Sequence, residues 1–102
     1  MDEFSWFVGL FEGEGTFFRE KAKYPRVVLK VDMTDKDTIE RCSEFLGVCV
    51  QTLKPYGSNK KVVYRVKKQG GPKSKVVELV KKMRPHLSAR RQQQIDNALE
   101  AL

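Results

Sequence analysis

Two carboxylates stand at the end of a short apolar segment that contains glycine. The segment that begins at Trp6 reads WFVGLFEGEG, so Glu12 and Glu14 follow a run that is typical of a buried helix. A glycine costs a helix interior about 0.5–1 kcal/mol relative to alanine, so Gly9 and Gly13 require a reason. Because they are four residues apart, they stack on one helix face, where a second helix backbone can approach closely.

The position of Glu14 predicts a metal site shared by two copies of the chain. Glu14 lies in the last turn of the helix, beside the glycine face. If the partner helix belongs to a second copy, a two-fold axis brings two Glu14 carboxylates together, and they repel unless a cation neutralises them. Oxygen ligands favour a hard cation, so we expect Mg²⁺. Glu12 lies on a different side of the helix and is not expected to join this site. The predicted dimer interface consists of Trp6, Gly9, Leu10 and Gly13.

Length and charge narrow the class of partner. The chain has 102 residues and a formal net charge of +7, which indicates a single domain over 1–102. The first 18 residues hold four acids and no Lys or Arg, so the rest of the chain carries all 20 bases. A basic body of this kind points to a polyanion, most often nucleic acid. A chain this small has little room for an enclosed site, so no small-molecule substrate is expected.

The apolar run and the cysteines exclude two other classes. The run over 4–11 is too short to cross a membrane, and acids rather than bases precede it, so we expect neither a signal peptide nor a membrane partner. Cys42 and Cys49 form no CxxC pair and the chain has one histidine, so a zinc site is not expected. Two buried, reduced thiols would suit an intracellular compartment such as the cytoplasm or a DNA-containing organelle.

These residues must be positioned by an alternation of helices and strands. Ser5 is expected to cap a helix that begins at Trp6 and ends at Gly15 in a left-handed C-cap, and Thr34 or Asp35 is expected to cap a second helix that Gly47 ends. The other expected elements are strands over 16–21, 26–33, 48–54 and 61–68, turns at 24–25 and 57–59, a break at 70–72, and helices over 73–83 and 88–102.

Two hairpins with helices between them predict an α+β fold with one antiparallel sheet, helices covering one face. Apolar and polar residues alternate in the second and fourth strands, so the uncovered face collects basic side chains. A β-ribbon fits the major groove of DNA, which makes this face a predicted DNA-binding surface. Its basic members are Arg26, Lys30, Lys61, Arg65 and Lys67.

The glycine-bearing segment resembles a known motif. The stretch FVGLFEGEG over 7–15 is similar to the LAGLIDADG motif of a family of homing endonucleases, with glycines and acids in matching positions. Thr16 and Phe17 fit the small and apolar residues that follow the motif, and MRPHLSARRQQQ over 83–94 is similar to a later stretch of the family. The resemblance implies an αββαββα fold, with a four-stranded, saddle-shaped antiparallel sheet and helices on one face.

The resemblance also implies roles for individual residues. Glu14 matches the acid that binds the catalytic divalent metal, and the carbonyl of Gly13 matches a position that can reach it. Asp35 matches a position that organises water, and Arg90, or Arg91 if the match shifts by one, matches a basic residue near the scissile phosphates. With one motif per chain, the implied enzyme is a homodimer that cuts a palindromic or nearly palindromic site by Mg²⁺-dependent phosphodiester hydrolysis. The strand implied to read bases presents Arg26, Val28, Lys30 and Asp32.

The chain departs from the family pattern at two points, and other functions stay open. Both motif acids are Glu, and the position of a second basic active-site residue holds Ile39, so that role is absent or taken by Arg41. One alternative is a cleavage-inactive member of the family, a regulator or an intron maturase that binds DNA or RNA. The other is a small basic RNA-binding module of ribosomal type, which has no use for the acids and glycines.

Overall fold

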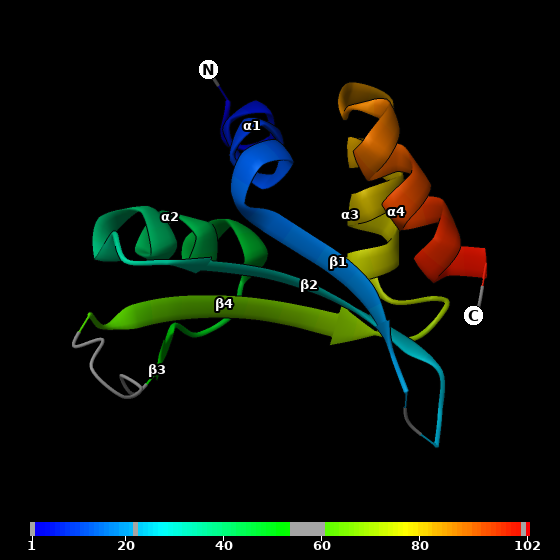
Figure 1. The fold of residues 1–102 in the computed structure, drawn as a ribbon, viewed down its shortest axis with the longest axis horizontal. Helices are drawn as coiled ribbons and strands as arrows, with labels where there is room; N and C mark the ends of the chain where they lie inside the picture. Colours follow the sequence, from blue (N-terminus) through cyan, green and yellow to red (C-terminus); the bar gives the residue numbers. More distant parts are fainter. Residues whose placement is uncertain (1, 22, 54–60, 101) are drawn as a thin grey trace.

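The fold alternates helices and strands in the predicted order. The computed structural model describes residues 2–21, 23–53, 61–100 and 102 (Figure 1). The turn expected at 57–59 lies outside these residues. The elements are α1 (Glu3–Glu14), β1 (Gly15–Glu20), β2 (Arg26–Met33), α2 (Lys36–Leu46), β3 (Gln51–Leu53), β4 (Val63–Gly70), α3 (Lys75–Met83), the 3-10 helix η1 (Arg84–His86) and α4 (Ala89–Glu100).

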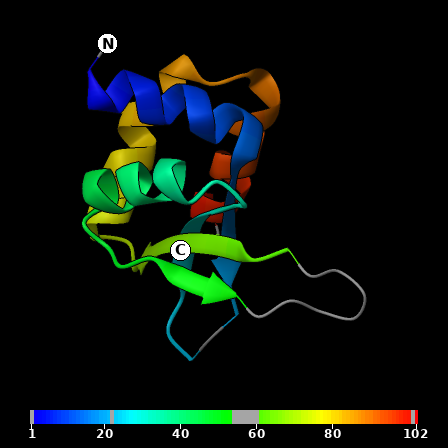
Figure 2. The same ribbon diagram turned by 90° about the vertical axis from the view of Figure 1, so that its left-hand side faces the viewer.

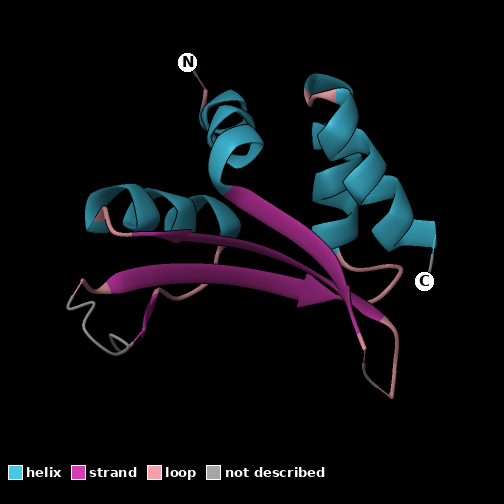
Figure 3. Ribbon diagram, viewed as in Figure 1, coloured by secondary structure: helices cyan, strands magenta, loops and turns pink. Residues whose placement is uncertain are grey.

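One antiparallel sheet carries all the helices on a single face, which confirms the predicted α+β class. The strand order is β1-β2-β4-β3, and every pairing is antiparallel. Figures 1 and 3 show the helices on one side of the strands, and Figure 2 shows the same layers from the side. Alternate residues of the strands point into the core between sheet and helices, and the other face of the sheet stays open. Large buried core side chains include Phe7, Phe11, Phe17, Leu29, Val31, Ile39, Leu46, Val66, Met83 and Ile95.

The first helix begins earlier than predicted. Asp2, not Ser5, is its N-cap: a carboxylate oxygen of Asp2 accepts a hydrogen bond from the backbone N–H of Ser5 at 2.7 Å. An Asp is as good a cap as a Ser, and the earlier start places Phe4 against the core. The helix also gains a polar contact from this extra turn, because Glu3 pairs with Arg41 of α2.

The end of α1 corrects a second prediction. Gly15 has φ −83° and ψ 163°, which is extended backbone rather than the expected left-handed cap. The helix passes directly into β1, with Gly15 as the first strand residue, paired with Val31. The reason for glycine is space, since a Cβ built at this position would lie 2.1 Å from Cδ2 of Phe11.

Replacing Gly15 by alanine is therefore expected to destabilise the fold strongly. The ring of Phe11 is fully buried in the core, so a Cβ at this position would overlap a packed side chain. Overpacking of this kind costs about 3 kcal/mol, which lowers the melting temperature of a domain this size by roughly 15 °C. Gly71→Ala is the matched control, because its new Cβ would meet ordinary contact with the carbonyl of Pro25 at 3.8 Å. Equal melting temperatures for both variants in thermal denaturation would contradict this explanation.

Smaller differences from the expected elements concern edges. The third strand is short, over 51–53, and the fourth is shifted to 63–70, so Gly70 belongs to the strand rather than to the break. Cys42 is buried as expected, and burial raises the pKa of its thiol to about 11. Cys49 is exposed, between α2 and β3, so the expectation that both thiols are buried is wrong for it. Among the described helices, none is long and apolar enough to cross a membrane.

Candidate functional site

The open face of the sheet carries six of the seven residues predicted to bind DNA. Strand alternation and register place them together, because Lys30 of β2 pairs with Lys67 of β4, and Asp32 pairs with Arg65. Lys61 precedes β4 and is exposed. The six that share the face are Arg26, Val28, Lys30, Asp32, Arg65 and Lys67.

Side chains on this face differ in how free they are. Lys67 forms no hydrogen bond or ion pair with any described residue, and the ammonium of Lys30 lies 5.7 Å from the ring centroid of Phe18. Arg26 is paired with Glu20 at 2.9 Å. Val28 is fully buried under its neighbours, so we expect it to support the basic side chains rather than to touch a base.

The glycine face of α1 is bare. An added Cβ would meet nothing within 4 Å at Gly9 or at Gly13, so neither glycine is needed for packing inside the described chain. Both glycines are exposed, whereas Trp6 and Leu10 are half-buried against the core. The guanidinium of Arg41 lies 4.0 Å from the ring centroid of Trp6, which anchors the indole beside this face.

Glu14 is exposed at the end of the same helix. Among the described residues it forms no hydrogen bond and no ion pair, although a negative charge at a helix C-terminus opposes the helix dipole. The carbonyl of Phe11 accepts from Gly15, and that of Glu12 accepts from Arg91, whereas no described residue donates to the carbonyl of Gly13. These oxygen donors suit a hard divalent cation, but one chain supplies too few of them. In the described part of the chain, no group of three or more His, Cys, Asp or Glu side chains could hold a metal.

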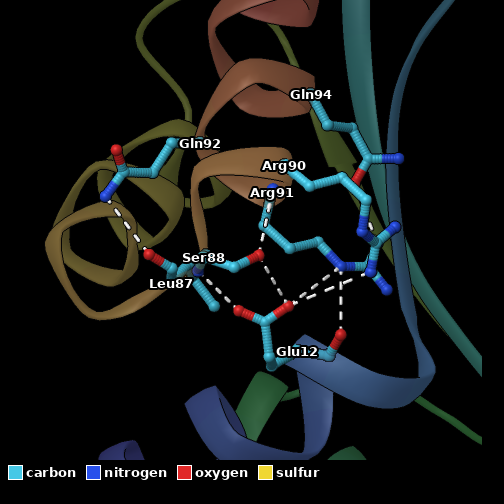
Figure 4. Close-up of polar contacts among 7 residues, drawn as sticks. All are labelled: Glu12, Leu87, Ser88, Arg90, Arg91, Gln92 and Gln94. Atoms are coloured by element: carbon cyan, nitrogen blue, oxygen red, sulfur yellow. Dashed lines mark hydrogen bonds and ion pairs between the residues drawn. The ribbon is translucent and has the colours of Figure 1, made fainter.

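The carboxylate of Glu12 binds the start of α4, at Ser88 (Figure 4). Its carboxylate accepts hydrogen bonds from the backbone N–H of Ser88 at 2.5 Å and from the hydroxyl of Ser88 at 3.0 Å. These bonds, together with the charges of Arg91 and Arg90, lower the pKa of Glu12. Since the pKa is lower than in the unfolded chain, this contact stabilises the fold at neutral pH and is lost as acid protonates the carboxylate. The carboxylate of Glu12 is thus engaged by Ser88, and its expected absence from a metal site stays a prediction.

The two arginines at the start of α4 have different surroundings. Arg91 is 5% exposed; its Nε donates to the backbone carbonyl of Glu12 at 3.1 Å and its Nη1 donates to Gln94 at 2.8 Å. Its guanidinium also lies 5.3 Å from the ring centroid of Phe11. The side chain of Arg90 is 71% exposed, and its guanidinium comes no closer than 4.0 Å to the carboxylate of Glu12. This loose contact leaves Arg90 able to bind an anion. Of the two, Arg90 suits the phosphate-binding role, and Arg91 holds α4 to the end of α1.

Asp35 and Ile39 occupy structural positions in α2. Asp35 is the N-cap, accepting from the backbone N–H groups of Asp37 and Thr38 and from the hydroxyl of Thr38. Its role in organising water stays a prediction. Ile39 is fully buried, as its place in the helix predicted. Arg41 is held by Glu3 through hydrogen bonds of 3.0 and 2.6 Å, so it is not free for an active-site role in this structure.

Sequence reasoning missed the contact between Glu12 and Ser88. The two residues are 76 positions apart, and nothing local to either one indicates the other. The separate signals were present: Ser88 was expected to start the last helix, and an acid is favourable at a helix N-terminus. Only the tertiary arrangement joins them.

Comparisons with known proteins identify the fold. The sequence matches no protein-family model and no curated protein. Among solved structures, the chain is similar to the archaeal intron-encoded homing endonuclease I-Vdi141I complexed with DNA, with a TM-score of 0.61 and 17% identity over 91% of this chain. This chain spans 62% of the length of that one. A second similar structure, the LAGLIDADG homing endonuclease I-SmaMI bound to cleaved DNA, has a TM-score of 0.43 and 18% identity, over 80% of this chain and 27% of that one. The chain thus has the fold of the LAGLIDADG homing endonucleases.

Proposed function

We propose that this chain is one subunit of a homodimeric, site-specific DNA endonuclease of the LAGLIDADG family. Each subunit grips half of a palindromic or nearly palindromic site with its open sheet face. Cleavage takes place between the two subunits, where the ends of the two α1 helices meet. The reaction is hydrolysis of a phosphodiester bond in each DNA strand.

The observation that carries this proposal is the bare outer side of α1, with a carboxylate at its end. Gly9 and Gly13 pay a helix penalty and have nothing within 4 Å at their Cβ positions, so no packing in the described chain accounts for them. A second α1 lying against them does account for them. The same arrangement explains why an acid with no partner among the described residues stands at the end of α1, since it would place two Glu14 carboxylates on either side of a two-fold axis.

The open sheet face suits a DNA half-site. β2 has eight residues, which at about 3.3 Å each span about 26 Å. At about 3.4 Å per base pair, this length corresponds to about seven or eight base pairs. Lys30 and Lys67 are directly paired on this face and supply positive charge for the phosphates.

The chemistry requires a hard cation, and the donors present fit one. Glu14 and the carbonyl of Gly13 from each subunit would hold Mg²⁺. Such a cation, when bound, would lower the pKa of the attacking water and stabilise the leaving oxygen. Arg90 binds a non-bridging phosphate oxygen and offsets the charge that develops there as water attacks phosphorus and the bond to the 3′ oxygen breaks. The water loses its proton to solvent, and the leaving 3′ oxygen takes one from solvent. The Arg91 and Glu12 contacts keep Arg90 close to the end of α1.

A selection of cleaved sites from a random duplex library tests this function. The purified protein is incubated with the library and Mg²⁺, and cleaved ends are sequenced. We expect a two-fold symmetric site cut on both strands, with no cutting in EDTA. If the protein enriches bound sites but nicks none of them in Mg²⁺ or Mn²⁺, it is a cleavage-inactive DNA-binding protein of the same fold.

A further inference from the structure

We propose that Asp32 and Arg65 act as one unit that reads a guanine in the major groove. This inference rests on the proposed function only in that the open sheet face binds DNA. It adds a base identity that neither the fold nor the charge of the face supplies.

The two side chains form a rigid pair across the centre of the sheet. Asp32 of β2 and Arg65 of β4 are direct cross-strand partners, so their side chains stand on the same open face. Nε of Arg65 donates to one carboxylate oxygen of Asp32 at 2.7 Å, and Nη2 donates to the other at 2.9 Å. The side chains are 27% and 31% exposed, which leaves an edge of the pair open to a ligand.

The geometry leaves the outer end of the guanidinium fork available. A guanidinium has five N–H donors, and Asp32 accepts two of them along the side that bears Nε. Three donors remain, and one on Nη1 and one on Nη2 form a second parallel pair; no described residue accepts a hydrogen bond from them. Two parallel donors match O6 and N7 of guanine, which is the commonest specific contact in the major groove. No other base presents two acceptors there.

The pairing also directs Arg65 away from the phosphates. An arginine whose charge is already balanced by a carboxylate gains less from a phosphate than a free cation does, and the carboxylate itself is repelled. The guanidinium of Arg65 lowers the pKa of the Asp32 carboxyl, and the carboxylate of Asp32 raises the pKa of Arg65. Both side chains therefore stay charged at neutral pH. Neighbouring cations without a carboxylate partner among the described residues, such as Lys67, remain available to bind the DNA phosphates.

The face contains a natural control for this inference. Arg26 and Glu20 also form an ion pair between β2 and β1, but through a single contact of 2.9 Å to Nε. Their side chains are 41% and 32% exposed, at the end of the sheet. We therefore expect Glu20 to fix the orientation of Arg26 less firmly than Asp32 fixes that of Arg65.

The test compares the base preferences of four proteins in binding selections from a random duplex library. We expect the wild type to select guanine at one fixed distance from the centre of the site. Asp32→Asn should weaken that preference by about ten-fold, and Arg65→Lys should remove it because an ammonium lacks the planar fork. Glu20→Gln should leave it unchanged. Circular dichroism and melting curves of all four proteins check that each variant is folded.

Salt dependence gives a second readout that a structural defect would not produce. Asp32→Asn leaves Arg65 as an unbalanced cation, so its binding to non-target DNA should depend more steeply on salt, by about one counterion. If the sites selected by the wild type contain no guanine whose preference changes in the Asp32 and Arg65 variants, the inference is wrong and the proposed function still stands. A wild type that binds no DNA overturns both.

Discussion

Replacing Glu14 by glutamine is expected to abolish DNA cleavage while DNA binding and folding are kept. Under the proposed function, the substitution removes the negative charge that would hold the cation and retains the size of the side chain. Loss of one such electrostatic group costs about 100- to 1,000-fold in rate, and here both subunits lose it at once. Glu14 has no partner among the described residues, so the melting temperature should not fall. The measurement is single-turnover cleavage of the selected site in Mg²⁺, beside a binding isotherm in Ca²⁺.

Glu12→Gln is the matched control, two residues away on the same helix. It removes the carboxylate that binds Ser88 and faces Arg91, so it should lower the melting temperature. At a temperature where the variant is folded, its cleavage should remain far above that of Glu14→Gln. Wild-type cleavage rates in Glu14→Gln would rule out the metal-binding role of Glu14. The RNA-binding alternative would be favoured if the wild type cleaves no DNA and if wild type and Glu14→Gln bind RNA equally well.

If the chain forms the proposed α1-mediated dimer, introducing leucine at both Gly9 and Gly13 is expected to convert that dimer to a monomer without unfolding the chain. In the single chain an added Cβ meets nothing within 4 Å at either position, and leucine favours a helix by about 0.5–1 kcal/mol per position relative to glycine. Between two closely packed helices, the same side chains force the backbones apart. Overpacking at both positions should weaken dimerisation by at least about 100-fold. Sedimentation velocity over a range of concentrations measures the effect.

The opposite signs of these two effects make the experiment decisive. A monomer whose melting temperature is raised and which has lost cleavage supports the α1 interface. Lys81→Leu on α3 adds an equally large apolar side chain to another exposed helix surface and should leave the dimer intact. A double leucine variant that dimerises as tightly as the wild type would show that α1 is not the dimer interface. A wild type that stays monomeric on DNA would show the same.

The features predicted well from the sequence are those that local patterns determine. The alternation of β2 gave its bounds as 26–33 and the correct face for each residue. Gly47 ends α2 with φ 69°, as a glycine after an apolar-periodic segment predicts. Glu14 and the glycine face were separated from Glu12 by helical geometry alone, and the structure places Glu12 on the other side, against α4.

The features that could not be predicted depend on contacts between distant residues. Gly15 looked like a helix cap because glycine is common there, but its φ is ordinary and the ring of Phe11 is what excludes a side chain. The pairing of Asp32 with Arg65 requires β2 to lie beside β4, which local hairpin signals do not indicate. A sequence shows that both residues face outward, whereas only the register shows that they meet.

The direct passage from α1 into β1 has a consequence for how such an enzyme would reject wrong DNA. Gly15 ends the helix and begins the strand, and its pairing with Val31 fixes the junction to β2, the strand proposed to face the bases. No loop separates Glu14 from the sheet, so there is no hinge that could absorb a poor fit. Under the proposed function, a mismatched base pair that tilts the sheet also misaligns the carboxylate. Fidelity would then appear in the rate of cutting and not only in the affinity for the site.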